Sequence, residues 1–272
     1  MNALLKGKKG IIFGALDPNS IAWKVAQKCH EQGATFVLTN APIALRMGKI
    51  NELAEATGST VVGADATSLE DLENLFTQSQ EILGGKIDFV LHSIGMSPNV
   101  RKGKHYTETD YDNYHKTMDI SAMSFHRVMQ TAKKLDALSH GASVLALSYI
   151  AAQRVFPDYN DMADAKSLLE SIGRSFGYHF GKSSGVRVNT ISQSPTRTTA
   201  GQGVKGFDAF YEYADRMSPL GNADADSCAD YCVVMFSDLT RMVTMQNLFH
   251  DGGFSFTGVS TEVMEMVAKS AE

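Results

Sequence analysis

Tyr149, Tyr159 and Lys166 are the residues of this chain whose types and spacing say most about possible chemistry. They follow the apolar run Ala142–Leu147, which predicts a buried strand, and the segment Lys166–Phe180 predicts a helix. A lysine seven positions after a tyrosine lies two helical turns further on and about 20° away around the axis, on the same face. That face would offer a phenol that donates a proton and an ammonium that holds a polar ligand. Chance pairs at this spacing are common, so the interpretation depends on structural context.

The composition is that of a soluble globular protein, with 272 residues, 43% apolar and 20% charged, and a formal net charge of −5. This charge gives no general attraction to nucleic acid or to an anionic membrane. No apolar stretch approaches the roughly 20 residues that span a bilayer, and the short apolar segment near the N-terminus is too short for a signal peptide.

The three cysteines are few and odd in number, which fits a reducing cytoplasm without disulfides. Cys228 and Cys232 are four residues apart and would share one helix face. Because no other ligand cluster lies near them in the sequence, we predict small core residues and no metal site.

Strand-like and helix-like segments alternate along almost the whole chain. The predicted strands are Gly10–Gly14, Thr35–Thr39, Thr60–Ala64, Ile87–Ser93, Ser143–Ser148, Val186–Ile191 and Met245–His250. The predicted helices are Ile21–Gln32, Ala44–Thr57, Leu69–Leu83, a long region Thr107–Leu138 broken near Asp119, one ending near Gly185, and Ala225–Ser237. This alternation predicts right-handed βαβ units and one α/β domain over residues 1–272, a doubly wound parallel sheet of about seven strands.

The first predicted strand-to-helix turn runs from Gly14 to Ala22. In a doubly wound sheet this turn points backbone N–H groups and a helix N-terminus at a pyrophosphate. Gly14 would permit the close turn, and Ser20, followed by Ile21, could cap the helix and bond phosphate. The segment is not a GxGxxG motif, so a capped helix after a proline turn is an equal alternative.

Three further segments follow predicted strands, where ligands bind in open α/β sheets. The first segment, Asp65-Ala66, could meet an adenine or be a solvated turn. The second, Ser93-Ile94-Gly95, could let the backbone approach a ribose or be a simple glycine turn. The third could hold a nicotinamide amide or be an ordinary loop, and the glycines after it predict a mobile substrate-binding lid at about residues 196–217. The candidate residues in the three segments are Asp65 and Ala66; Ser93, Ile94 and Gly95; and Pro195, Thr196 and Thr198.

These motifs together resemble bacterial enoyl-[acyl-carrier-protein] reductase of the FabI type, a divergent branch of the short-chain dehydrogenase/reductase superfamily. They are Gly14-x5-Ser20-Ile21-Ala22, His92-Ser93-Ile94-Gly95, Asp119-Ile120-Ser121, Ser148-Tyr149-x9-Tyr159-x6-Lys166, Gly185–Asn189, Pro195-x-Arg197-Thr198 and Asp251-Gly252-Gly253. The resemblance covers residues 1–256. Its Tyr-x6-Lys spacing differs from the Tyr-x3-Lys of ordinary superfamily members, whose upstream Ser is replaced here by the Ser148-Tyr149 pair.

The resemblance implies a seven-stranded Rossmann sheet, a cytoplasmic homotetramer, and NADH-dependent reduction of enoyl thioesters on acyl carrier protein in type II fatty acid biosynthesis. Tyr159 would stabilise the enolate oxygen, and Lys166 would bond the nicotinamide ribose. Tyr149 would line the acyl channel with Met96; whether its hydroxyl also assists at the thioester stays open. The apolar run Phe254–Val259 could pack across a subunit interface.

Some positions depart from the family pattern. Gln193-Ser194-Pro195 stands where many relatives have Ala-Gly-Pro, so a more polar nicotinamide pocket is expected. Asp208 and Ala209 occupy positions that are basic in some relatives, so part of the docking patch for the acidic carrier protein is missing. Three cations could compensate or could simply belong to the solvated surface, and the second alternative is favoured for Lys102; they are Lys205, Arg197 and Lys102.

The segment Asn40-Ala41-Pro42 after the second strand is small and uncharged, which favours NADH because a 2′-phosphate would find little compensation for lost hydration. No carboxylate repels NADPH there, and Arg46 could reach back towards it. Two other functions remain alternatives: a carbonyl or alcohol oxidoreductase of the wider superfamily, against which the absence of Tyr-x3-Lys counts, and a cofactor-binding sensor without catalysis.

Overall fold

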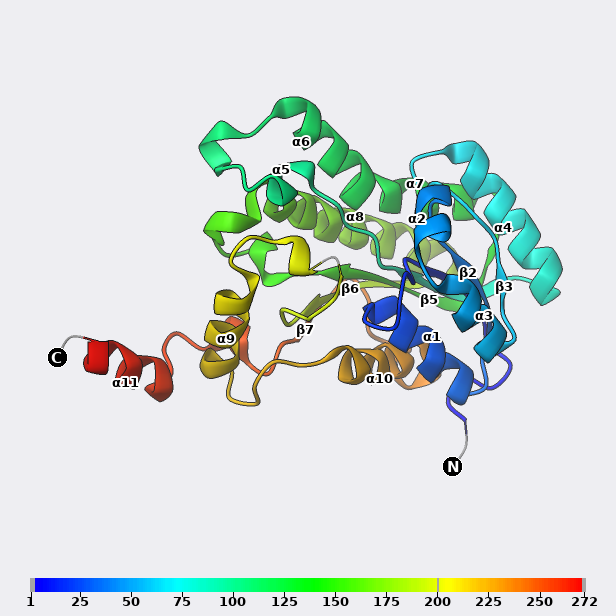
Figure 1. Ribbon diagram of the computed structural model, residues 1–272. Coiled ribbons are helices and arrows are strands. Elements are labelled where there is room, and N and C mark those ends of the chain that lie inside the picture. The colour runs from blue at the N-terminus through cyan, green and yellow to red at the C-terminus, as the bar shows by residue number, and fades with distance from the viewer. Residues whose placement is uncertain (1–2, 200, 271–272) are drawn as a thin grey trace.

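The computed structural model describes residues 3–199 and 201–270, which form a seven-stranded sheet in the order β3-β2-β1-β4-β5-β6-β7 with every pair parallel (Figure 1). The strands are β1 (Lys9–Phe13), β2 (Thr35–Thr39), β3 (Thr60–Val61), β4 (Ile87–His92), β5 (Leu138–Ser148), β6 (Arg187–Gln193) and β7 (Asn247–His250). The strand order reverses between β1 and β4, and such a switch point opens a crevice at the carboxyl ends of the strands. The predicted doubly wound α/β fold is confirmed.

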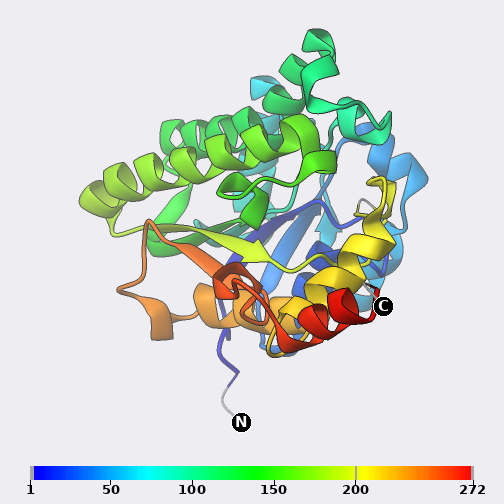
Figure 2. The same ribbon diagram turned by 90° about the vertical axis from the view of Figure 1, so that its left-hand side faces the viewer.

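Helices cover both faces of the sheet (Figures 1 and 2). They are α1 (Ile21–Glu31), α2 (Pro42–Met47), α3 (Ile50–Thr57), α4 (Leu69–Leu83), α5 (Pro98–Arg101), α6 (Tyr111–Met118), α7 (Ser124–Lys134), α8 (Asn160–Ser184), α9 (Phe207–Met217), α10 (Ala225–Phe236) and α11 (Thr261–Ser270). Helices α4, α7 and α8 lie on one face, and α1, α3 and α10 on the other.

A hydrophobic core lies on each face of the sheet. In β1, Ile11 and Phe13 join the core under α4, α7 and α8, while Ile12 between them joins the core under α1, α3 and α10. Successive side chains of a strand point to opposite faces, so a continuous apolar run is what a strand buried on both faces requires. These continuous apolar runs are also the pattern from which the strands were predicted.

Helix α4 shows why some boundaries were predicted correctly. The Ser68 side chain accepts a hydrogen bond from the backbone N–H of Asp71, and Gly84 ends the helix in the left-handed conformation. A side-chain cap at the N-terminus and a glycine just beyond the C-terminus are the local signals for helix ends. The predicted bounds Leu69–Leu83 are confirmed.

Other boundaries differ because tertiary contacts decide them. The helix predicted over 44–57 is split at Gly48, whose position leaves no room for a Cβ beside the Leu16 carbonyl oxygen, and the Lys49 N–H donates to that oxygen at 2.7 Å. The strand predicted over 60–64 is only Thr60–Val61. The long helical region ends at Lys134, and β5 already begins at Leu138.

The break predicted near Asp119 is a π-helical turn, Asp119–Met123, between α6 and α7. Helix α11 was not predicted; it has no buried residue and projects from the body of the molecule (Figure 1). No helix within the described part of the chain is long and apolar enough to cross a bilayer.

Candidate active site

The first βα turn and the loop after β4 meet at the switch point of the sheet. Gly14 has φ +93°, and a Cβ on it would overlap the carbonyl oxygen of Ser93. The Gly14 N–H donates to Thr39 O at 3.1 Å. Glycine is therefore required where these segments approach, and a dinucleotide fits a backbone-lined crevice of this kind at a helix N-terminus.

Ser20 stands at the N-cap position of α1 without acting as its cap. Its hydroxyl donates to Asp17 O at 2.6 Å and accepts the N–H groups of Leu16 and Asp17 at 3.2 and 3.3 Å. No side-chain hydrogen bond from Ser20 caps the helix. The predicted helix cap is therefore wrong: Ser20 closes the turn itself, and Ile21 begins the helix.

Tyr159 and Lys166 come from adjoining elements. Tyr159 ends a short 3₁₀ turn, Pro157–Tyr159, and α8 begins at Asn160, a non-glycine residue with φ +38°. The prediction that both side chains share one helix face is therefore wrong in detail, because Tyr159 lies just outside the helix. Lys166 lies in the second turn of α8, and the strained backbone at Asn160 sets the direction of the chain between them.

Lys166 is buried, with 7% of its surface exposed, and its ammonium donates to Leu147 O at 2.7 Å. Burial lowers the pKa of Lys166 from 10.5 to about 8, and the negative charge of Glu170 acts in the opposite direction. A Cβ on Gly95 would lie 3.8 Å from Nζ, so the ammonium also borders the loop after β4. Lys166 thus sits between the ends of β4 and β5.

The rings of Tyr149 and Tyr159 lie with their centroids 5.1 Å apart. Burial raises the pKa of each phenol above its ordinary value of 10, with Tyr159 and Asp251 adding to the shift at Tyr149. Both phenols are therefore protonated at neutral pH and able to donate. The Tyr149 hydroxyl is buried without a hydrogen-bond partner among the described residues.

Met96 is held at its backbone beside this site. The hydroxyl of Ser121, in the π-helical turn, accepts the Met96 N–H at 2.9 Å and lies 3.0 Å from the Met96 carbonyl oxygen. Such turns often occur at functional sites. Of the neighbouring candidates, Ser93 and Ile94 are half-buried, and Ile94 packs against the core under α8.

Asp65 and Ala66 lie beyond β3, away from the tyrosines. Asp65 is exposed and accepts the N–H and hydroxyl of Thr67 at 2.9 and 2.7 Å, while Ala66 is buried. The predicted strand up to residue 64 ends earlier, so this pair belongs to a turn. An adenine could meet it only at the β2–β3 end of the crevice.

The loop after β6 is connected to the first βα turn. Pro195 is buried, the Thr196 hydroxyl donates to Ser194 O at 2.9 Å, and Thr198 Oγ1 accepts the Gly201 N–H at 2.9 Å. The Thr199 hydroxyl donates to Asp17 Oδ2 at 2.6 Å. The third candidate segment therefore faces the turn that begins at Gly14.

The side-chain amide of Gln193 forms hydrogen bonds beneath the loop after β6. Its Nε2 donates to Ala223 O at 2.9 Å, and its Oε1 lies 2.8 Å from Nδ1 of His250. The Ser194 hydroxyl accepts the Ala223 N–H at 2.9 Å. The side chains that were expected to make the nicotinamide pocket more polar are thus occupied in anchoring the loop to the segment before α10.

Two buried polar residues at the site were given no role in the prediction: His92, which was named only as part of a motif, and Glu170, which was not named. His92 is fully buried, and burial together with the charge of Lys166 lowers its pKa from 6.5 to about 3. Glu170 is 4% exposed and accepts the Ser148 hydroxyl at 2.7 Å. The sequence offered one signal for Glu170, since it follows Lys166 by four residues on a predicted helix.

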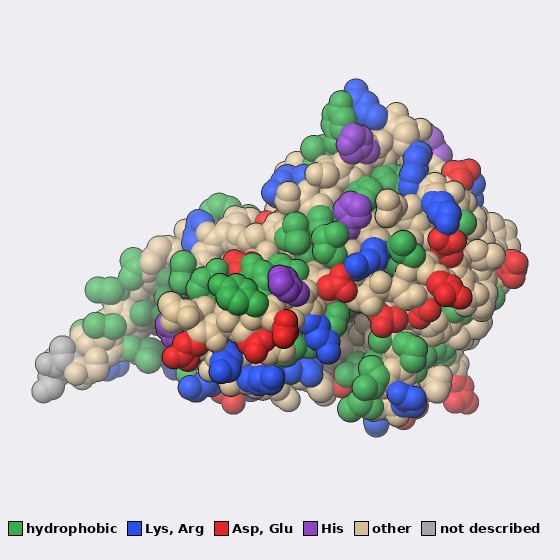
Figure 3. Space-filling model, turned by 90° about the horizontal axis from the view of Figure 1, so that it is seen from above, with side chains coloured by type: hydrophobic (Ala, Val, Ile, Leu, Met, Phe, Trp, Pro, Cys, Tyr) green, Lys and Arg blue, Asp and Glu red, His purple; other side chains and the backbone are tan. Residues whose placement is uncertain are grey.

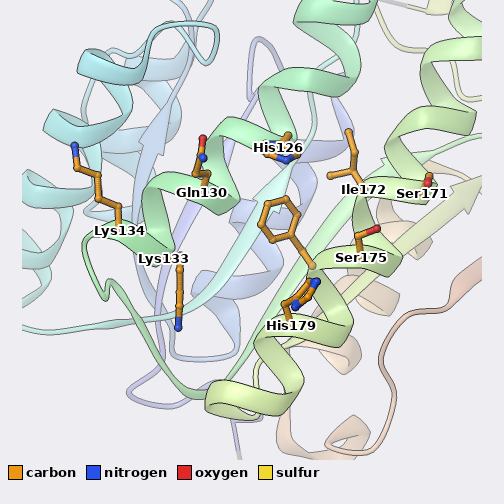
Figure 4. A pocket seen from close by; sticks show the side chains of 9 residues that line it. His126, Gln130, Lys133, Lys134, Ser171, Ile172, Ser175 and His179 are labelled. Atoms are coloured by element: carbon orange, nitrogen blue, oxygen red, sulfur yellow. The ribbon is translucent and has the colours of Figure 1, made fainter.

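A separate groove of about 590 Å³ lies between α7 and α8, away from the tyrosines (Figure 4). His126, Gln130 and Lys133 line it from α7, and Ile172 and His179 from α8. Within residues 3–199 and 201–270, no group of three or more His, Cys, Asp or Glu side chains is placed to hold a metal ion.

Comparison with known proteins agrees with this arrangement. A family model described as enoyl-(acyl carrier protein) reductase matches residues 14–255. The chain is 35% identical to enoyl-[acyl-carrier-protein] reductase [NADH] 2 of Rhizobium meliloti, over 96% of each protein. It is 33% identical to the Bacillus cereus reductase [NADH] FabI, over 94% of this chain and 99% of that protein.

Solved structures give the same result. The FabI–NADH complex from Alistipes finegoldii is 62% identical, has a TM-score of 0.93, and covers 94% of this chain and 91% of that one. The reductase from Aquifex aeolicus is 32% identical with a TM-score of 0.87, over 94% and 99% of the two chains. The chain belongs to the enoyl-(acyl carrier protein) reductase family.

Proposed function

We propose that the protein reduces the trans-2 double bond of enoyl thioesters carried by acyl carrier protein, with NADH, in the elongation cycle of fatty acid biosynthesis. The observation that carries this is the set formed by the packed rings of Tyr149 and Tyr159 and the buried Lys166 at the carboxyl edge of the sheet, in a chain of this family. The named relatives are NADH enzymes, and the Alistipes finegoldii structure is an NADH complex.

Bound NADH supplies a hydride to the β-carbon of the enoyl group. Negative charge then develops on the thioester oxygen, and the Tyr159 phenol donates a hydrogen bond to that oxygen. Uptake of a proton from solvent at the α-carbon then gives the saturated thioester. Because burial raises the pKa of Tyr159, the phenol keeps its proton until the charge appears. The Lys166 ammonium holds the ribose hydroxyls and adds a positive charge close to the developing enolate.

The cofactor lies along the crevice in this proposal. The turn from Gly14 through Ser20 to Ile21 meets the pyrophosphate, and the loop after β4 meets the nicotinamide ribose. Asp65 and Ala66 border the adenine. The backbone around Pro195, Thr196 and Thr198 holds the nicotinamide amide, supported by the hydrogen bonds that tie this loop to its neighbours.

The acyl chain lies against Met96, Tyr149 and Tyr159, under the segment 196–217. The α9 residue Phe210 packs edge-on at 6.4 Å from Tyr149 and at 5.1 Å from Phe156. These contacts support the proposal that this segment is a lid which opens for the substrate, within a single catalytic domain of residues 1–272.

The carrier protein docks on cations beside this lid. Arg101 and Lys102 are exposed near the end of α5, and a Cβ on Gly103 would lie 3.6 Å from Lys205 Cδ, so two distant segments form one basic surface. Arg197 contributes less, because its guanidinium pairs with an aspartate at 2.7 Å. The Lys205→Glu variant tests the surface: we expect a higher KM for carrier-protein substrates and an unchanged KM for a small enoyl thioester.

A cytoplasmic homotetramer completes the proposal. Phe256 and Val259 are 79% and 60% exposed, and α11 exposes Met264 and Val267 at 56% and 57%. Hydrophobic side chains also lie on the face above α6, α7 and α8, in patches among charged groups (Figure 3). Exposed apolar surface of this kind is typical of subunit contacts. Light scattering gives the oligomeric state directly.

The decisive assay is turnover of crotonyl and longer enoyl thioesters, followed separately with NADH and NADPH. We expect oxidation of NADH with the enoyl thioesters and none with simple ketones. Turnover of ketones without any enoyl thioester activity would instead support a carbonyl reductase. Cofactor binding without turnover of either substrate class would support a sensor.

A further inference from the structure

Glu170 is a buried carboxylate close to the catalytic residues. It is 4% exposed, and carboxylates are rarely buried without partners. One of its oxygens accepts the Ser148 hydroxyl at 2.7 Å and the other accepts Gln153 Nε2 at 3.2 Å. Both partners are donors, as an ionised carboxylate requires. Glu170 thus joins α8 to the end of β5 and to the loop beyond it.

Two successive turns of α8 hold two successive residues of β5. Lys166 donates to the carbonyl of Leu147, and Glu170 accepts from the side chain of Ser148. The next residue is Tyr149, whose ring packs against Tyr159. The position of both tyrosines therefore depends on this double attachment of the strand end.

Glu170 also has an electrostatic effect on Lys166, because the other titratable groups around Lys166 are neutral. From β4, His92 is neutral because burial lowers its pKa to about 3. From the end of β5 and the 3₁₀ turn, Tyr149 and Tyr159 are neutral because burial raises their pKa values. Among the described residues, Glu170 on α8 itself is the acidic group whose charge raises the pKa of Lys166.

We propose that Glu170 is a positioning residue for the reductase reaction: it holds the Ser148–Tyr149 segment in place and keeps the Lys166 ammonium charged for binding the cofactor. The proposal rests on the proposed function in one respect, since it takes Lys166 as the ligand of the nicotinamide ribose. The attachment of β5 and the charge on Lys166 are separable, and different variants remove each of them.

The test of the charge is Glu170→Gln, which keeps the size of the side chain and an acceptor for Ser148. NADH binding is measured by fluorescence titration from pH 6 to 9.5 without enoyl substrate. In the unaltered protein we expect affinity to fall as pH rises through about 8, where Lys166 loses its proton. In Glu170→Gln this fall should come at a lower pH than in the unaltered protein, because a nearby negative charge is gone.

Matched variants separate charge from structure. Asp164→Asn removes a carboxylate from the same helix, where Asp164 accepts hydrogen bonds from Tyr106 and Tyr114. This variant should leave unchanged the pH at which NADH affinity has fallen halfway, which we call the midpoint. Ser148→Ala removes the attachment and no charge, so it should lower kcat about 10-fold or more without moving the midpoint. Glu170→Asp keeps the charge on a shorter side chain and should behave like Ser148→Ala.

A midpoint in Glu170→Gln equal to that of the unaltered protein would overturn the role in charge, and a normal kcat in both Ser148→Ala and Glu170→Asp would overturn the role in positioning. If Glu170→Gln does not fold, Glu170→Asp still tests positioning, and a midpoint shifted in that variant would contradict the role in charge. The NADH titration needs no enoyl turnover, so it stands even if the proposed substrate proves wrong.

Discussion

Tyr149 and Tyr159 pack with their ring centroids 5.1 Å apart and their planes inclined by 56°, although nine residues separate them in the sequence. One ring follows β5 and the other precedes α8. Burial raises the pKa of both phenols, yet of these two hydroxyls only that of Tyr149 is buried without a hydrogen-bond partner among the described residues. The two hydroxyls therefore differ in their surroundings, and substitutions should distinguish them.

Tyr159→Phe should lower kcat for enoyl reduction by about 10–1000-fold, the loss expected when one donor to a developing negative charge is removed. NADH affinity should change little, because the ribose is assigned to Lys166. Stopped-flow oxidation of NADH with one enoyl thioester measures the rate, and fluorescence titration measures the affinity. Tyr149→Phe is the control: it removes the neighbouring phenol and should cost less than Tyr159→Phe. A larger loss at Tyr149 would reverse the two roles.

Lys166→Ala should weaken NADH binding as well as turnover, because the ammonium that we propose as the ligand of the ribose is lost. The side chain also donates to Leu147 O at 2.7 Å, so some loss of stability is expected from the unpaired carbonyl. Isothermal titration with NADH at pH 7 measures the first effect, and thermal unfolding of the free protein the second. Lys133→Ala, at the groove on α7, is a control for general effects of removing a lysine. Unchanged cofactor affinity in Lys166→Ala would contradict the ribose role.

The sequence predicted those parts of the fold that depend on local signals. Strand Thr35–Thr39 and helix Leu69–Leu83 were placed to the residue, because apolar patterning and helix caps act over a few positions. The break at Gly48 was missed because it arises from contact with Leu16, more than thirty residues earlier. Local patterns carry no information about which distant backbone group approaches a residue.

The site was predictable to the same extent. The spacing of Tyr159 and Lys166 led to the catalytic roles proposed for them, although the helix begins one residue too late for the argument from a shared face. Ser20 was expected to cap α1, yet its hydroxyl closes the preceding turn, and both arrangements use the same residue type. Glu170 contacts Ser148 only because α8 packs beside β5, which sequence spacing cannot reveal.

His92 gives a prediction for acid stability. The folded protein keeps His92 neutral down to a pKa of about 3, whereas the unfolded chain takes up this proton near pH 6.5. Below pH 6.5 the unfolded state therefore binds more protons, and stability falls as the pH falls, by about 1.4 kcal/mol per pH unit for one such group. Between pH 6.5 and 4.5 this one residue should account for about 2–3 kcal/mol of lost stability.

Urea unfolding at several pH values measures this effect in the unaltered protein and in His92→Gln. Gln can still donate to the Ser124 hydroxyl, which His92 Nε2 contacts at 2.9 Å, and it does not titrate. The variant should lose less stability on acidification by about the stated amount. His30 is exposed, so His30→Gln is a control that should behave like the unaltered protein. Parallel pH profiles of the His92→Gln variant and the unaltered protein would show that His92 does not carry this dependence.

The residues after β2, which we expect to meet the adenine ribose, should determine the choice between NADH and NADPH. Asn40 after β2 already uses its side chain: Nδ2 donates to Ala15 O at 3.2 Å, and Oδ1 accepts the Ala41 N–H at 3.0 Å. It can still accept one more hydrogen bond from a ribose hydroxyl. Helix α2 begins at Pro42, two residues earlier than expected, and places the exposed Arg46 in its last turn.

We expect kcat/KM to be higher with NADH than with NADPH by about 5–150-fold, which corresponds to about 1–3 kcal/mol, the contribution of a few hydrogen bonds. A 2′-phosphate would lose hydration here without a cation held beside it, because Arg46 is exposed and would have to give up its own hydration to reach back. Steady-state kinetics with one enoyl thioester and both cofactors tests this. Arg46→Ala should then change kcat/KM with either cofactor by no more than a few-fold, and the control Lys49→Ala should behave in the same way. A clear preference for NADPH that disappears in Arg46→Ala alone would show that Arg46 reaches the phosphate.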